Sequence, residues 1–185
     1  MACAPGIGVT MARRPVKGRL VAVDGAQADT VKGTARTVST ECRPRAAVSH
    51  EGASGIFDDI AAGDPGAGRP SARTLLLLYA ADLAFRLRWE IGPALEEGRS
   101  VVVAPYVDTA IAVGRAAGLP RSWLVDLFAF APKPSERRVV TLRADEISPG
   151  RARGFVDLAC RSMAGSATPD EFARTVGRHL TPRRR

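Results

Sequence analysis

The segment that decides the fold reads ARTLLLLYAADLAFRLRWEIGPALEEGRSVVVA over residues 72–104. Apolar side chains cover a broad surface of its first part, which predicts a long and mostly buried helix from about Ala72 to Leu95. Ser71 is suited to cap the start of this helix, and Pro93 is expected to kink or shorten its last turn. The continuous apolar run Val101–Ala104 then predicts a buried strand of a parallel sheet.

Strands and helices alternate on both sides of this segment. Further strands are predicted at Leu20–Val23, which is followed by Asp24 and Gly25, at Ala46–Val48 and at Arg138–Leu142. Further helices are predicted at about Ser122–Phe130 and at Pro169–Leu180 with Thr168 as its cap, and Gly and Pro mark 61–72 as a loop. This alternation predicts an α/β fold in which a parallel sheet is flanked by helices on both faces.

Length and composition fit one domain. The chain has 185 residues, of which 45% are hydrophobic and 25% charged, so it can bury a core of its own. Gly, Pro and Arg without periodicity mark residues 1–18 as a flexible extension. We therefore expect a single domain over residues 19–182, between this extension and a basic tail at 183–185.

The chain is basic. It carries a formal net charge of +8, from 27 Lys and Arg residues against 19 Asp and Glu residues. A positive surface favours anionic partners such as nucleotides, nucleic acid or a membrane surface. Part of the charge lies in clusters near the two ends that are typical of solvated tails, and no basic motif interleaved with aromatic residues is present. Specific nucleic-acid binding is therefore not expected.

The cysteines and histidines offer no cross-link or metal motif. Cys3, Cys42 and Cys160 are odd in number and contain no C-x-x-C pair, and His50 and His179 are isolated. This pattern predicts neither a disulfide framework nor a structural zinc, and no metal site is expected. No apolar run is long enough for a signal peptide or a membrane span, so we expect a cytoplasmic protein without membrane contact.

Several ordered stretches resemble the thymidylate kinase family. They are Leu76–Asp82 (L-L-F/Y-A-A-D-R in the family), Ile91–Gly98 (I-x-P-A-L-x-x-G), Val101–Thr109 (V-V-x-D-R-Y-x-x-S), Trp123–Ala129 (W-x-x-x-L-x-x-F-A) and Lys133–Pro134 (K-P-D). Upstream, Leu20–Gly25 is similar to F-I-x-F-E-G and Ser49–Gly52 to R-E-P-G. The resemblance ends at about Leu142. It implies a P-loop nucleoside monophosphate kinase-like three-layer sandwich, ATP and Mg²⁺ as cofactors if the protein is active, and pairing into a homodimer through helices.

The phosphate-binding motif that this resemblance implies is altered. The template G-x-x-x-x-G-K-S/T places backbone amides, a lysine and a hydroxyl around the phosphates and the metal. Here Gly25 is followed by a polar stretch in which Lys32 arrives one residue late, Val31 replaces the preceding glycine and Gly33 the first hydroxyl. Two interpretations stay open: a relaxed phosphate loop that uses Gly25, Lys32, Gly33 and Thr34, or a surface strand-to-helix turn with a solvated lysine.

The acceptor site implied by the resemblance has lost its charged groups. Ala104 and Pro105 stand where the family has the Asp and Arg of D-R-Y, and Leu83 stands where its helix carries a nucleotide-binding arginine. Tyr79 occupies the position of the aromatic residue that stacks on the base, although core packing explains it equally well. The remaining nucleoside-site candidates are Tyr106, which keeps the Y of D-R-Y, and Asp108, which is suited to a metal, a ribose hydroxyl or a helix cap.

Three hypotheses of function follow, and no catalytic residue is assigned. The first is a relative that has lost kinase activity and serves as a binding or assembly protein. The second is an active nucleotide or nucleoside kinase that transfers the γ-phosphate of ATP to a dTMP-like or altered acceptor. The third is a protein whose basic surface binds a partner protein or, weakly, nucleic acid.

Overall fold

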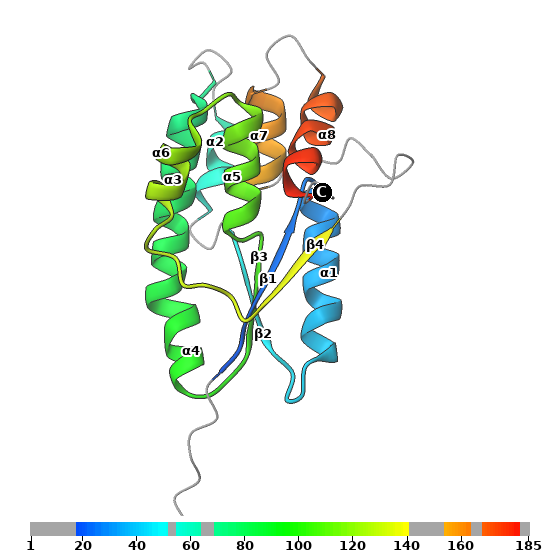
Figure 1. Ribbon diagram of the computed structural model, residues 1–185, viewed down its shortest axis with the longest axis vertical. Helices are drawn as coiled ribbons and strands as arrows, with labels where there is room; N and C mark the ends of the chain where they lie inside the picture. The colour runs from blue at the N-terminus through cyan, green and yellow to red at the C-terminus, as the bar shows by residue number, and fades with distance from the viewer. Residues whose placement is uncertain (1–17, 52–54, 64–68, 141–153, 164–167, 182–185) are drawn as a thin grey trace, which may run out of the picture.

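The computed structural model of the protein describes residues 18–51, 55–63, 69–140, 154–163 and 168–181. Four of its strands form one parallel sheet in the order β2-β3-β1-β4 (Figure 1). They are β1 (Leu20–Gly25), β2 (Ala47–His50), β3 (Val101–Ala104) and β4 (Glu136–Val140). The central strands β1 and β3 are buried along their whole length, as their continuous apolar runs predict.

Helices cover both faces of this sheet. They are α1 (Ala28–Glu41), α2 (Ile56–Ala62), α3 (Ala72–Arg86), the π-helical turn η2 (Leu87–Ile91), α4 (Gly92–Glu96), α5 (Val107–Ala116), α6 (Arg121–Leu127), α7 (Phe155–Met163) and α8 (Pro169–Leu180). On one face, Val21, Val23 and Val102 pack against the buried side chains of α1. On the other face, side chains of α3, α5, α7 and α8 form a larger core with alternate residues of β1 and β3 (Figure 1). The predicted three-layer α/β sandwich is confirmed.

The long helix of the opening segment is continuous from α3 through η2 to α4. The Ser71 hydroxyl accepts a hydrogen bond from the Thr74 amide at 3.1 Å and caps its start. Pro93 does not end the helix; the turn before it is π-helical, and the Gly92 amide reaches back to the Leu87 carbonyl. A Cβ on Gly92 would lie 2.7 Å from the Leu87 oxygen, so this turn requires glycine.

The remaining elements test the other sequence predictions. The closing helix α8 has the predicted bounds, and Thr168 forms a reciprocal capping box with Glu171. By contrast, α6 ends at Leu127, short of the predicted Phe130, and α2, α5 and α7 were not predicted. The extension over residues 1–17, the tail 183–185 and the strand end at Leu142 lie outside the described residues.

Candidate functional site at the carboxyl end of the sheet

The junction between β1 and α1 is short. Only Ala26 and Gln27 separate the end of β1 from the first residue of α1. Lys32, Gly33 and Thr34 therefore lie inside α1, and the phosphate loop proposed for this stretch is not formed. The structure has a strand-to-helix turn at this point, and Lys32 is half-buried within α1.

The space above Gly25 is filled by the protein itself. A Cβ on Gly25 would lie 2.6 Å from Cγ2 of Val31, whose side chain is fully buried. The Gly25 amide donates to the Thr109 hydroxyl at 3.1 Å, so it is not available to a ligand. Val31 adopts helical geometry and not the strained loop conformation that the motif would impose on it. The residues after β1 therefore do not fit a triphosphate or the Mg²⁺ that accompanies it.

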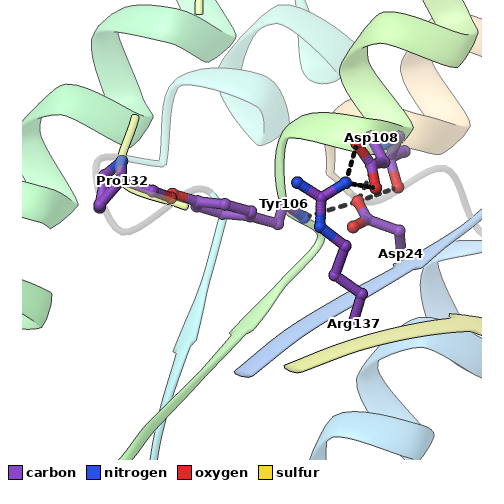
Figure 2. Close-up of polar contacts among 6 residues, drawn as sticks. Asp24, Tyr106, Asp108, Pro132 and Arg137 are labelled. Carbon is purple, nitrogen blue, oxygen red and sulfur yellow. Dashed lines mark hydrogen bonds and ion pairs between the residues drawn. The ribbon is translucent and has the colours of Figure 1, made fainter. Parts of the chain in front are cut away.

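Asp24 organises the end of β1 (Figure 2). Its Oδ1 accepts hydrogen bonds from the Tyr106 amide at 3.0 Å, the Thr109 amide at 2.9 Å and the Thr109 hydroxyl at 2.7 Å. Asp24 thus caps the N-terminus of α5 from another element, because Tyr106 at the N-cap position offers no side-chain cap. Burial raises the pKa of Asp24 to about 6, although the hydrogen bonds from Thr109 favour its charged form.

Asp24 was not assigned a role from the sequence. The available signal was an acidic residue that ends an otherwise apolar strand. Its partners Tyr106 and Thr109 lie more than 80 positions away, at |i−j| of 82 and 85, so only the tertiary structure brings them together.

Tyr106 and Asp108 face in different directions from the start of α5 (Figure 2). Tyr106 is buried, and its hydroxyl donates to the Pro132 carbonyl at 2.7 Å. Asp108 forms an ion pair with Arg137 of β4 at 3.0 Å, in a position exposed to solvent. Because Asp24 provides the cap, Asp108 contributes to α5 only as a negative charge in its first turn.

Tyr79 lies in the core beneath this site. Its side chain is fully buried, and its ring centroid lies 4.4 Å from that of Phe155 and 6.1 Å from that of Phe128. Its hydroxyl donates to the Pro105 carbonyl at 2.8 Å and lies 3.1 Å from the Tyr106 carbonyl. Of the two interpretations, this arrangement is core packing, because aromatic side chains occupy the space beside the ring.

A polar cluster beside Tyr79 was not predicted from the sequence. Arg86 of α3 is fully buried, and its Nε donates to Asp82 at 2.8 Å, while its Nη1 and Nη2 have no hydrogen-bond partner in the part of the chain that the structure describes. Glu51, directly after β2, is also buried, and neither of its carboxylate oxygens accepts a hydrogen bond from another of the described residues. The only sequence signal was the presence of charged residues within an otherwise apolar helix face and at a strand end.

Lys32, a phosphate-site candidate from the sequence, acts through its charge on this polar cluster. Burial raises the pKa of Glu51 to about 7, against the opposing effect of the Lys32 and Arg86 charges. Lys32 also acts on His50, whose pKa is lowered chiefly by burial and whose Nδ1 lies 3.3 Å from the Ala104 carbonyl oxygen. Lys32 is therefore near the carboxyl end of the sheet, although it is not in a phosphate loop.

Two further observations concern metals and membranes. Within the described ranges, no group of three or more His, Cys, Asp or Glu side chains is placed to hold a metal ion. None of the helices in those ranges combines the length and the apolar character needed to span a membrane.

The topology places the fold in a known class. Parallel strands in the order β2-β3-β1-β4 between helical layers define an α/β protein of the P-loop nucleoside monophosphate kinase-like kind. The solved thymidylate kinase of Candida albicans superposes with a TM-score of 0.62 at 16% identity, over 89% of this chain and 76% of that one. The thymidylate kinase structure from Ehrlichia chaffeensis gives a TM-score of 0.55 at 14% identity, over 80% of this chain and 87% of that one.

Sequence comparison with known proteins points to one family within this fold class. The probable thymidylate kinase of Pyrococcus abyssi is 38% identical over 79 residues, which are 42% of this chain and 38% of that protein. The thymidylate kinase of Xanthomonas oryzae pv. oryzae is 32% identical over 120 residues, which are 63% of this chain and 53% of that protein. The chain thus spans about half, or less, of the length of these curated relatives, and no family model matches it. The protein is thymidylate-kinase-like in sequence and in fold.

Proposed function

We propose that the protein is a thymidylate-kinase-like domain that does not transfer phosphate at ordinary kinase rates and that acts as a binding or assembly protein. One observation carries the proposal: β1 passes into α1 through two residues, so Lys32, Gly33 and Thr34 are wound into a helix. Without that loop, the backbone amides at the end of β1 are not arranged as the cradle that would surround the β- and γ-phosphates.

The acceptor side supports the same proposal. Leu83 and Ala104 are both buried apolar residues, and Pro105 has neither a charge nor an amide proton to offer a phosphate. Charge-assisted hydrogen bonds are the strong contacts in phosphate recognition. Their loss weakens the binding of a nucleoside monophosphate at the positions that the resemblance marks as its site.

The alternative is an active kinase with an altered acceptor. It is favoured by the names of the relatives and by Lys32, which lies close enough to the carboxyl end of the sheet to influence Glu51 and His50. In this alternative the Lys32 ammonium would bind ATP phosphate from the first turns of α1. Binding of Mg²⁺ would then require protein ligands that take up their positions only after a rearrangement of this structure.

A coupled assay decides between the two functions. Purified protein is incubated with ATP, Mg²⁺ and thymidine monophosphate, and diphosphate formation is compared for the natural chain, Lys32→Ala and the exposed control Lys133→Ala. We expect no turnover above background in all three, and no shift of the melting temperature by ATP. Turnover at ordinary kinase rates that Lys32→Ala abolishes and Lys133→Ala preserves would establish the alternative.

We also propose that the protein forms a homodimer and acts in the cytoplasm. Large apolar side chains are exposed along α3 and η2, with Leu77 at 52%, Phe85 at 51% and Trp89 at 65% exposure. Such a surface is typical of a protein interface. The double variant Phe85→Ser/Trp89→Ser should convert a dimer to a monomer in light scattering after gel filtration, whereas a natural chain that is monomeric at all concentrations removes the proposal.

A further inference from the structure

A hollow of about 350 Å³ opens on the side of the continuous helix that runs from α3 through η2 to α4. One wall belongs to this helix, and the other belongs to the connection between α6 and β4, which passes beside it (Figure 1). The lining includes Leu87, Ile91, Gly92 and Leu95 of the helix and Phe130 and Pro132 of the connection. The hollow is therefore distinct from the polar clusters at the carboxyl end of the sheet.

The surface of this hollow is apolar. Arg88 is the only charged residue among the described residues that line it, and its Cζ lies 5.6 Å from the centroid of the Trp89 ring. Phe130 leaves 47% of its surface exposed at the edge of the hollow. Gly92 adds no side chain that could fill the space. An apolar recess beside an exposed aromatic residue is typical of a surface that binds another apolar group.

The chain that leads into β1 starts beside this hollow. Gly18 is the first of the described residues, and its amide donates to the Leu95 carbonyl at 3.4 Å. A Cβ on Gly18 would collide with the Arg99 carbonyl oxygen and would lie 2.9 Å from the Leu95 Cα, so only glycine lets the chain pass this close to α4. Residues 1–17 therefore join the described structure at Leu95, which is itself part of the lining.

The segment before Gly18 contains a short amphipathic stretch. Ile7, Val9 and Met11 alternate with small or polar residues, and this period of two would place three apolar side chains on one side of an extended chain. Residues 12–17, between this stretch and Gly18, include three basic residues, which are unsuited to an apolar recess. The stretch and its basic linker thus have different roles toward the hollow.

The dimensions of the segment and of the hollow agree. Ala84 and Leu95, at the two ends of the helical wall, are 11 positions apart, which corresponds to about 16 Å along the helix axis. An extended chain from Ile7 to Met11 covers about 13 Å, and residues 12–17 can bridge up to about 20 Å. A segment on so short a tether has an effective concentration on the order of millimolar, which favours it over a second copy or a separate partner.

We propose that residues 7–11 bind in this hollow of their own chain, with their three apolar side chains against Leu87, Ile91 and Phe130. The N-terminal segment then acts as a cover for apolar surface that is otherwise open to other molecules. This inference goes beyond the proposed function and does not depend on it. Phe85 and Trp89, on which the proposed homodimer rests, do not line the hollow, so the two proposals can fail separately.

Photo-cross-linking in the full chain tests the inference. A benzophenone amino acid replaces Phe130 in one preparation and Val125 in another, because Val125 is exposed on α6 and does not line the hollow. Chains of two isotopic compositions are mixed, so that mass spectrometry separates cross-links within one chain from cross-links between copies. We expect the probe at position 130 to react with residues 7–11 of its own chain and the probe at position 125 not to do so.

Variants of the segment assign the contact. The combined substitutions Ile7→Ser, Val9→Ser and Met11→Ser should lower the yield of this cross-link at least about tenfold, because the three side chains no longer gain from leaving water. The matched control Thr10→Ser should leave the yield unchanged. These positions lie outside the described core, and urea unfolding of each variant verifies that the domain is folded.

The outcomes that overturn the inference are distinct from those that bear on the proposed function. They are no cross-link from position 130 to residues 7–11, an equal cross-link from position 125, and an unchanged yield in the triple variant. Cross-links to residues 7–11 or to α3 of the other copy would also overturn it and would assign the hollow to a second copy. Kinase turnover by a chain with the intramolecular cross-link would overturn the proposed function alone.

Discussion

Replacing Glu51 by Gln should stabilise the protein at alkaline pH. Burial raises the pKa of Glu51 from its ordinary 4.5 to about 7, so the folded state holds this proton more tightly than the unfolded state does. Between these two values the unfolded chain has lost the proton and the folded chain has kept it. The stability of the natural protein therefore falls as the pH rises through this window, and the full loss is present above pH 7.

The size of the effect follows from the two pKa values. The interval from 4.5 to about 7 corresponds to about 3 kcal/mol, at about 1.4 kcal/mol for each pH unit. Gln is uncharged at every pH and has nearly the shape of the protonated acid. We therefore expect Glu51→Gln to exceed the natural protein in free energy of unfolding by about 3 kcal/mol at pH 8.5 and by about 1 kcal/mol at pH 5.5.

Urea unfolding followed by circular dichroism measures this difference. The natural chain, Glu51→Gln and the exposed control Glu96→Gln are compared at pH 5.5, 7.0 and 8.5, and the control should show no pH-dependent difference. A Glu51→Gln variant that is less stable than the natural protein at pH 8.5 would refute the reasoning, because it would mean that the ionised carboxylate has a stabilising partner in the free protein.

Three further substitutions probe the site and the fold. Asp82→Asn leaves the buried charge of Arg86 without its counter-ion and should lower the free energy of unfolding by about 3–5 kcal/mol in urea titrations. Thr109→Val removes the hydroxyl that donates to Asp24 and should cost about 1–3 kcal/mol, with a further rise in the pKa of Asp24 seen by NMR titration. Thr168→Ala removes one half of the capping box and should cost about 1 kcal/mol, measured as a lower melting temperature.

Surface variants provide the controls for this set. Glu97 and Arg99 form an ion pair that is more than half exposed, so Glu97→Gln should change the free energy of unfolding by less than about 1 kcal/mol. If Asp82→Asn lowers the free energy of unfolding no more than this surface variant does, the buried charge of Arg86 does not need Asp82 as its counter-ion. A Thr109→Val variant with unchanged stability and an unchanged Asp24 pKa would show that the α5 cap tolerates the loss of this hydroxyl.

Elements whose signals are local were predictable from the sequence. The apolar runs that became β1 and β3, the broad apolar surface of the helix that starts at Ala72 and the Thr168 cap of α8 were read with small errors in their bounds. The π-helical turn before Pro93 was not predictable from the sequence. A proline indicates that a helical turn is disturbed, but it does not specify which hydrogen-bond pattern that turn adopts.

The candidate site was less predictable. The length of the β1–α1 connection depends on whether residues after Gly25 gain more from helix formation than from an open loop, and the burial of Val31 against Gly25 decides this. Asp24 acquires its role only when α5 starts beside it. Arg86 and Glu51 become buried only when the tertiary structure packs other elements around them.

The sequence by itself determined the layers of this protein and its thymidylate-kinase-like relationship, because hydrophobic periodicity and motif order are properties of neighbouring residues. Only the tertiary structure decided that the resembled phosphate segment is a helix and that a carboxylate and a guanidinium are buried together without full pairing. The physical reason is that burial and hydrogen-bond satisfaction depend on residues distant in the chain, which no local pattern specifies.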